Sequence, residues 1–295
     1  MTYTSLSDYL KSEYGEKLYK LSLSSGCTCP NRDGFLASAG CIFCSAGGSG
    51  EFAAPSALPV AEQIGAAKER IRGKAHADKY IAYFQSYTNT YGDIGRLRAL
   101  YMDAISHPDV AILSIATRPD CLSDEVLEML KDLNAIKPVW VELGLQTSKP
   151  ESVSYIRRGY ENSVYEKAVA DLNAIGIKVV THIIIGLPGE TYEDMENSVM
   201  FACRCGTWGL KLQLLHVLKN TDLAKDYEAG LFETLSMDEY IDIICRLLGK
   251  IPKEIVIHRL TGDGPKNLLI SPIWSGNKKQ VLNRLLNEIR NRDEQ

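Results

Sequence analysis

The sequence lacks the features of membrane, secreted and disordered proteins. No apolar run reaches the roughly 20 residues of a transmembrane helix, and the first residues lack the charged-then-apolar order of a signal peptide. We therefore expect a cytoplasmic protein without membrane contact. Repeats, low-complexity segments and Pro/Ser-rich linkers are also absent, which favours one continuous domain. A formal charge of -4 and a pI near 5.8 exclude a surface that is basic throughout, although a local basic patch remains compatible with them.

What the sequence does contain is enough for a large core. It has 295 residues, of which 45% are hydrophobic and 24% charged. A chain of this length buries roughly 75% of the surface that its unfolded form exposes, so neither disulfides nor metal are needed to make up for a small interior. Eight cysteines in a chain expected to be cytoplasmic indicate metal or redox chemistry rather than disulfides.

Strand-like and helix-like segments alternate through the first 220 residues. Runs of β-branched and aliphatic residues lie at 17–24, 79–84, 110–116, 139–145, 177–185 and 210–217, with amphipathic segments near 59–72, 94–106, 123–135, 161–174 and 191–204. This order predicts a parallel sheet with right-handed crossovers. We expect an α/β fold: a partial (β/α)6 TIM-type barrel over residues 1–220, with its functional loops at the carboxyl ends of the strands.

The pattern changes in the last quarter of the chain. Helices are expected near 221–229 and 236–249, a strand within 254–260, and a basic helix at about 277–292. We predict that residues 221–295 form a small α/β extension that packs on the barrel and is not an independent domain.

Cysteines are concentrated in a Gly-rich loop after the first expected strand. Cys29, Cys41 and Cys44 have the spacing C-x11-C-x2-C, and thiolates at such spacing hold zinc or an iron–sulfur cluster. Cys27 leaves two interpretations open. With it, four thiolates would enclose a zinc ion in a binding module; without it, three thiolates would leave one iron open. Cys27 lies within the end of the strand, so its joint ligation requires a local bend, which favours three ligands.

Seven segments stand in order at the ends of the expected strands. They are GCTCPNRDG, GCIFCSAGGSGEF, YIAYFQSYTNT, SIATRPDCL, WVELGLQT, HIIIGLPGE and VIHRLTGDGP, and they extend from residue 26 to residue 265. Together they resemble radical S-adenosylmethionine (SAM) enzymes, in particular the YhcC/YtqA (MnmL-like) branch, which modifies the wobble uridine of tRNA. The long gap before Cys41 departs from the C-x3-C-x2-C spacing usual in the superfamily.

The resemblance implies two cofactors and a reaction type. Cys29, Cys41 and Cys44 would bind three irons of a 4Fe-4S cluster, and the amino and carboxylate groups of SAM would bind the fourth. Reductive cleavage of SAM would give methionine and a 5′-deoxyadenosyl radical, which removes hydrogen from an unactivated carbon.

The resemblance also assigns cofactor contacts to the strand ends. Phe43 is similar to the family's aromatic residue near the adenine, and an apolar residue there also shields a cluster. Arg118 suits a carboxylate, with a surface salt bridge as the alternative. Glu142 lies on an apolar strand and needs a partner. For the other polar members, ordinary loop polarity or a satisfied core histidine is the alternative. The set is Phe43, Gln85, Tyr87, Asn89, Arg118, Glu142, Gln146, His182, Gly186 and Gly189.

Charged residues at the expected barrel mouth are candidates for substrate contact and catalysis: His216, Lys219, Arg259 and Asp263. The reaction implied by the resemblance converts 5-carboxymethylaminomethyluridine of tRNA toward 5-aminomethyluridine. Arg118, Lys219 or Arg259 would then bind the side-chain carboxylate. The implied partners are tRNA and an electron donor such as flavodoxin or ferredoxin.

Two basic clusters are compatible with tRNA phosphates. They are Lys68, Arg70, Arg72, Lys74 and Lys79, and Lys278, Lys279, Arg284, Arg290 and Arg292. Lysine-rich helix faces are usually only solvated, so the charge pattern leaves tRNA binding open. A radical enzyme for a small metabolite and a zinc-stabilised binding module remain as alternatives.

Overall fold

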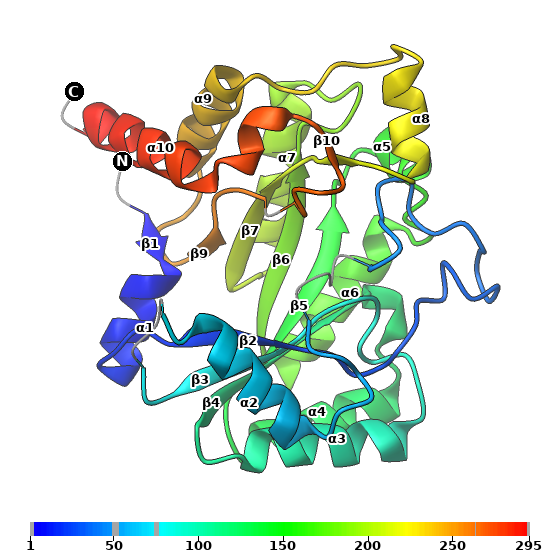
Figure 1. Cartoon of the computed structure of the whole chain (residues 1–295), viewed down its shortest axis with the longest axis vertical. Coiled ribbons are helices and arrows are strands. Elements are labelled where there is room, and N and C mark those ends of the chain that lie inside the picture. The colour runs from blue at the N-terminus through cyan, green and yellow to red at the C-terminus, as the bar shows by residue number, and fades with distance from the viewer. Residues whose placement is uncertain (1–2, 49–52, 74–76, 263, 294–295) are drawn as a thin grey trace.

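One parallel sheet forms the centre of the computed structural model, which describes residues 3–48, 53–73, 77–262 and 264–293. Its eight strands have the order β1-β9-β7-β6-β5-β4-β3-β2. They are β1 (Thr4–Ser5), β2 (Tyr19–Leu23), β3 (Tyr80–Phe84), β4 (Val110–Thr117), β5 (Val139–Gln146), β6 (Lys178–Ile185), β7 (Gly209–Leu214) and β9 (Val256–Arg259). The strands turn from upright at β6 and β7 to nearly horizontal at β2 and β3 (Figure 1), the curvature of a partial barrel.

Helices surround this sheet, most of them on its outer face (Figure 1). They are α1 (Leu6–Tyr14), α2 (Val60–Ile71), α3 (Ile94–Ser106), α4 (Asp124–Asn134), α5 (Pro150–Tyr155), α6 (Asn162–Ala174), α7 (Tyr192–Arg204), α8 (Asp222–Glu228), α9 (Met237–Leu248) and α10 (Lys278–Asp293). The strands β8 (Val217–Leu218) and β10 (Leu269–Ser271) form a separate antiparallel pair. Within the described ranges, no helix is both long and apolar enough to cross a bilayer.

Side-chain caps fix several helix starts. The Ser123 hydroxyl accepts a hydrogen bond from the amide of Val126 at the start of α4. At the start of α7, Thr191 and Asp194 form a reciprocal capping box. These caps satisfy amides that the first helical turn leaves unpaired, so the loops that lead from the strands into α4 and α7 end at defined residues.

The described residues form three buried hydrophobic clusters, one of which includes Ile184 and Leu215 at the carboxyl ends of β6 and β7. The main core lies between the sheet and its helices and includes Leu113, Leu143 and Leu212. A smaller cluster closes the opposite end, where Tyr9 of α1 packs against Trp140 and Trp208 with ring centroids 6.4 and 4.9 Å apart. Because the amino end is filled, a ligand has access from the carboxyl ends of the strands.

The predicted parallel partial barrel is confirmed, and two further strands, β9 and β1, extend its sheet. β9, from the last quarter of the chain, pairs with β7, and β1 pairs with β9, both in parallel. The C-terminal part therefore supplies a strand to the barrel sheet itself. The sequence did not predict β1 and α1, which begin the chain and lie at this edge.

Candidate functional site

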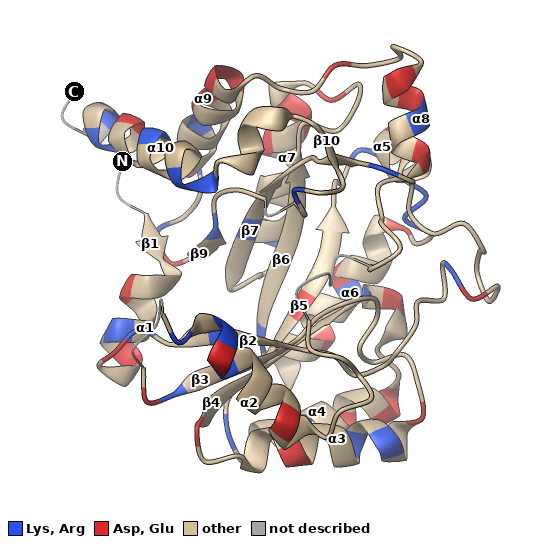
Figure 2. Ribbon diagram, in the orientation of Figure 1, with Lys and Arg blue, Asp and Glu red and all other residues tan. Residues whose placement is uncertain are grey.

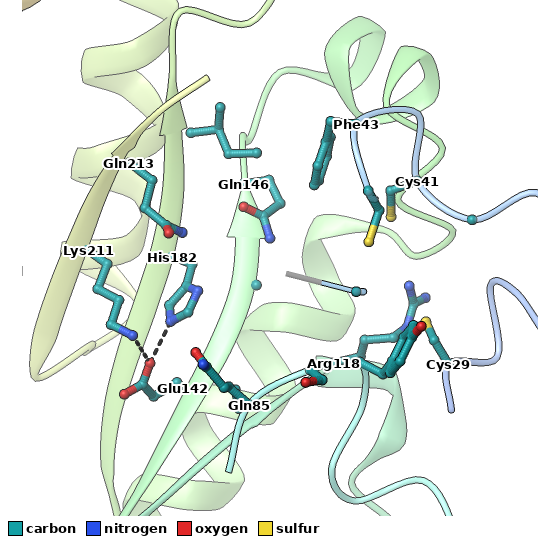
Figure 3. Close-up of a pocket in the computed structure, with 18 of the residues that line it drawn as sticks. Cys29, Cys41, Phe43, Gln85, Arg118, Glu142, Gln146, His182, Lys211 and Gln213 are labelled. Atoms are coloured by element: carbon teal, nitrogen blue, oxygen red, sulfur yellow. Dashed lines mark hydrogen bonds and ion pairs between the residues drawn. The ribbon is translucent and has the colours of Figure 1, made fainter. Parts of the chain in front are cut away.

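The three predicted metal-binding cysteines line one pocket at the carboxyl end of the barrel, which Figure 3 shows. The amide of Cys44 donates to the carbonyl of Cys41 at 3.0 Å, so a single turn holds both residues. Asn31 donates its side-chain amide to the Cys41 sulfur at 3.5 Å and to the Arg157 carbonyl at 2.7 Å. The loop is therefore tied to the barrel beside the thiols that it presents.

The arrangement of these thiols is compatible with an iron–sulfur cluster. Burial raises the pKa of the Cys41 thiol, while Asn31 and Arg118 oppose the rise. Within the described part of the chain, no three His, Cys, Asp or Glu side chains are placed to share one metal ion. The thiolates of a 4Fe-4S cluster bind different irons, so they need not meet around a single ion.

Cys27 points away from this pocket. Gly26, with a φ of 71°, turns the chain just before it, and the Cys27 sulfur accepts a hydrogen bond from the Arg96 guanidinium at 3.3 Å. It is buried and is not among the residues that line the pocket. Cys27 thus lies apart from the three cysteines that line the pocket, and the three-ligand site stays a prediction.

Glu142 is the centre of a buried polar network inside the barrel. One carboxylate oxygen lies 2.5 Å from the Lys20 ammonium and accepts from Ser114 at 2.9 Å. The other accepts from Lys211 and lies 2.7 Å from His182 Nε2. Although burial opposes ionisation, Lys20 and Lys211 hold the pKa of Glu142 well below its usual range. Glu142 is thus an ionised, fully buried counter-ion for two lysines.

His182 is neutral in this network. Burial and the neighbouring Lys211 lower its pKa to about 4, against the opposing effect of Glu142. Because the ionised carboxylate of Glu142 can only accept, His182 Nε2 carries the ring proton and donates a hydrogen bond to it. Glu142 and His182, two of the residues predicted to contact the cofactor, do line the pocket, but they are hydrogen-bonded to each other.

Sequence reasoning missed Lys20 and Lys211. Each lies on a strand of apolar residues, Lys20 on β2 and Lys211 on β7. The signal was present, because a carboxylate predicted to be buried at Glu142 needs a cation of equally low exposure. The Lys211 side chain is only 4% exposed, so it is one of the few lysines that could meet this need.

Gln146 presents an unpaired acceptor to the pocket. It ends β5 with a φ of 67°, and its amide oxygen is buried without a hydrogen-bond partner among the described residues. Figure 3 shows Gln146 between Gln213 and Phe43 among the pocket side chains. A buried acceptor left unpaired costs about 1–3 kcal/mol. A hydroxyl or amine of a bound small molecule would satisfy it, so the pocket fits a polar cofactor such as SAM.

Gln146→Leu is expected to weaken SAM binding about 10-fold, because one hydrogen bond to the cofactor is worth about 1.4 kcal/mol or less. Calorimetric titration of the anaerobically reconstituted protein with SAM measures this. Folding stability should not fall, because no protein hydrogen bond is lost at the amide oxygen. Gln280→Leu on α10, away from the pocket, is the matched control. An unchanged SAM affinity in Gln146→Leu would exclude the contact.

Three further predicted cofactor residues lie outside the pocket lining. Asn89 is fully buried and bridges the Ala116 carbonyl, at 2.7 Å, and the Ser25 hydroxyl, at 2.6 Å. Gly186 has a φ of 89° and lies against Leu235. The Gly189 carbonyl accepts from the Lys149 ammonium at 2.9 Å. These residues hold loops in place in this structure, whereas Gln85 and Tyr87 do line the pocket.

Arg118 lines the pocket but is already paired. Its guanidinium forms two hydrogen bonds with the Asp120 carboxylate, at 2.9 and 2.7 Å, and lies 5.0 Å from the centre of the Tyr160 ring. Burial opposes its charge, but Asp120 raises the pKa of Arg118 above its ordinary value. Arg118 interacts electrostatically with Cys29 and Cys41, so it belongs to the cysteine side of the pocket.

The predicted substrate residues differ in whether they line the pocket. His216 and Arg259 line the pocket, and His216 Nε2 lies 3.1 Å from the Ser275 hydroxyl. Lys219 is exposed and is not part of the lining. Asp263 lies outside the described residues.

Comparisons with known proteins agree with this geometry. The family model of the Radical SAM superfamily matches residues 25–202, and that of the Radical_SAM C-terminal domain matches residues 207–291. The protein YtqA of Bacillus subtilis is 42% identical over 290 residues, which cover 98% of this chain and 90% of YtqA. A tRNA uridine(34) acetyltransferase of Methanocaldococcus jannaschii is 29% identical over 177 residues, or 58% of this chain and 31% of that protein.

A solved structure shares the fold. Elp3 of Methanocaldococcus infernus, with an N-terminal deletion, superimposes with a TM-score of 0.66 at 19% identity. The match covers 86% of this chain and 58% of the Elp3 chain. At this identity the likeness concerns the fold alone.

Proposed function

The chain belongs to the Radical SAM superfamily, and we propose that it acts on the wobble uridine of tRNA, converting 5-carboxymethylaminomethyluridine toward 5-aminomethyluridine. Enzymes of this superfamily bind a 4Fe-4S cluster and SAM, as the sequence predicted. When bound, these cofactors supply a radical that removes hydrogen from an unactivated carbon. An external donor such as flavodoxin or ferredoxin would supply the electron.

The chain's own residues would hold and shield these cofactors. Cys29, Cys41 and Cys44 would each bind one iron, and Arg118 beside them suits the carboxylate of SAM. The Gln146 amide oxygen would accept a hydrogen bond from the cofactor, and Phe43 would cover it. The closed amino end of the barrel limits water to one side of the pocket.

The observation that carries the tRNA assignment is the similarity to a tRNA uridine(34) acetyltransferase over 58% of the chain. The surface charge adds little support for tRNA binding. Lys68 pairs with Asp109 at 2.5 Å, and Arg292 pairs with Asp242 at 2.8 Å. Lys74 of the first basic cluster lies outside the described residues. Glu288 interrupts the basic residues of α10 (Figure 2), so neither predicted cluster is a purely basic face.

Cells that lack this protein are expected to accumulate 5-carboxymethylaminomethyluridine in tRNA and to lose 5-aminomethyluridine and its derivatives. Mass spectrometry of digested tRNA measures both nucleosides. The wild-type gene should restore the profile and Cys41→Ala should not. An unchanged profile would reject the substrate assignment.

The same point is tested with purified components. Anaerobic incubation of the reconstituted protein with SAM, a strong reductant and hypomodified tRNA should release 5′-deoxyadenosine only when tRNA is present. Release that is independent of tRNA would instead favour a small-metabolite substrate.

We also infer that residues 221–295 are an extension of the barrel and not an independent domain. β9 lies between β1 and β7 in the main sheet, so its removal would leave the edge of β7 unpaired. A cytoplasmic location stays a prediction.

A further inference from the structure

Two cations face each other on the last strands of the barrel. Lys211 of β7 is paired in register with Arg259 of β9, and both side chains line the pocket. Like charges directly opposite each other on neighbouring strands are destabilising. The Arg259 guanidinium makes no hydrogen bond or ion pair with any residue that the structure describes, and Lys211 shares its single carboxylate, Glu142, with Lys20.

The pocket therefore has an excess of positive charge at this wall. Lys211 and Arg259 line this wall, and Glu142, which also pairs with Lys20 outside the lining, is the only acidic residue among the described pocket-lining residues. His182 adds no charge near neutral pH because its pKa is about 4. Burial lowers the pKa of Lys211 while Glu142 opposes this fall, so Arg259 is the cation of this wall that has no carboxylate partner among the described residues. Arg259 is half-buried, and a charge that is partly withdrawn from water without a counter-ion is unfavourable, so the wall suits an anion.

This wall lies apart from the cysteines. In Figure 3, Lys211, His182 and Gln213 stand on one side of the pocket, and Cys29 and Cys41 on the other. The cysteine side has a cation of its own, Arg118, within electrostatic reach of Cys29 and Cys41. A cofactor anchored at the cysteines would meet Arg118 first, which leaves the wall of Lys211 and Arg259 to the substrate.

We propose that Lys211 and Arg259 form the receptor for a carboxylate carried by the substrate. The inference deepens the proposed function and rests on it for the identity of that substrate, whose uridine side chain ends in a carboxylate. The Arg259 guanidinium suits two-point binding of a carboxylate, and the Lys211 ammonium adds a point charge. Glu142 positions Lys211. Arg118, which lies on the cysteine side of the pocket and is assigned to the cofactor, and Lys219, outside the pocket lining, are not part of this receptor.

The receptor is tested first with a small carboxylate as a probe. We expect sodium acetate to raise the melting temperature of the reconstituted, SAM-bound protein by about 3 °C relative to sodium chloride at equal ionic strength. Arg259→Gln and Lys211→Met should each lose this rise, and Lys219→Gln should keep it. Equal shifts in the wild type and Arg259→Gln would overturn the receptor.

Two further measurements identify the source of the carboxylate. SAM affinity should be unchanged in Arg259→Gln, because a 10-fold loss would assign the anion to the cofactor. Wild-type protein should bind tRNA bearing the carboxymethylaminomethyl group about 10-fold more tightly than tRNA bearing the aminomethyl group, and Arg259→Gln should bind both equally.

The combined results separate the two proposals. An acetate effect that depends on Arg259, with no tRNA binding or turnover, would reject tRNA as the substrate and keep the receptor. Turnover of tRNA without an acetate effect, and without discrimination between the two tRNAs, would reject the receptor and keep the proposed function.

Discussion

Cys41→Ala is expected to lower 5′-deoxyadenosine formation more than about 100-fold, whereas Cys27→Ala should leave it within about twofold. Loss of a residue that only orients a metal ligand already costs 10- to 100-fold, and loss of the ligand itself should cost more. The Cys41 thiol lines the pocket, and its turn is fixed by the hydrogen bond from Cys44. The Cys27 sulfur is instead turned toward Arg96.

Iron and sulfide content separates these variants independently of activity. After anaerobic reconstitution, the wild type and Cys27→Ala should both be brown and contain close to four irons for each chain, as a 4Fe-4S cluster requires. Cys41→Ala should lose most of this iron. Retention of metal in Cys41→Ala together with its loss in Cys27→Ala, or zinc bound in place of iron, would contradict the three-ligand site.

The alternation of the sequence predicted most of the barrel because its signals are local. The amphipathic segment expected at 94–106 has the bounds of α3, Ile94–Ser106, since the apolar period and the cap at Asp93 lie within one stretch of chain. β1 has no such signal. It has two residues and forms only by pairing with β9 from the other end of the chain, so no local pattern predicts it.

The candidate site also contains contacts that no local sequence pattern predicts. The cysteine spacing and the isolated Glu142 were visible in the sequence, but Lys20 and Lys211 reach Glu142 only because the sheet curves β2 and β7 toward β5. Asn89 was misplaced for a backbone reason. Ser86 and Tyr87 have φ values of 78° and 56°, which break the alternation after β3 and turn Asn89 into the interior. Strand periodicity cannot be extended through such residues.

Glu142→Gln is expected to lower the free energy of unfolding by about 3–5 kcal/mol, which is the cost of removing one partner from a buried ion pair. The carboxylate is fully buried and serves Lys20, Lys211 and His182 together, so its neutralisation leaves two lysines without a counter-ion. Urea denaturation of the reconstituted protein measures the change. Glu288→Gln, in a partly exposed pair with Arg292 on α10, should change stability by less than about 0.5 kcal/mol.

The source of this loss is tested by removing a cation as well. Lys20→Met combined with Glu142→Gln should recover part of the stability, because the variants share one network and are not additive. Acetate should stabilise Glu142→Gln more than it stabilises the wild type, since the uncompensated positive charge beside Arg259 has grown. Additive effects of the two substitutions, together with an unchanged acetate response, would show that Glu142 is a packing group and not the counter-ion that balances the pocket wall.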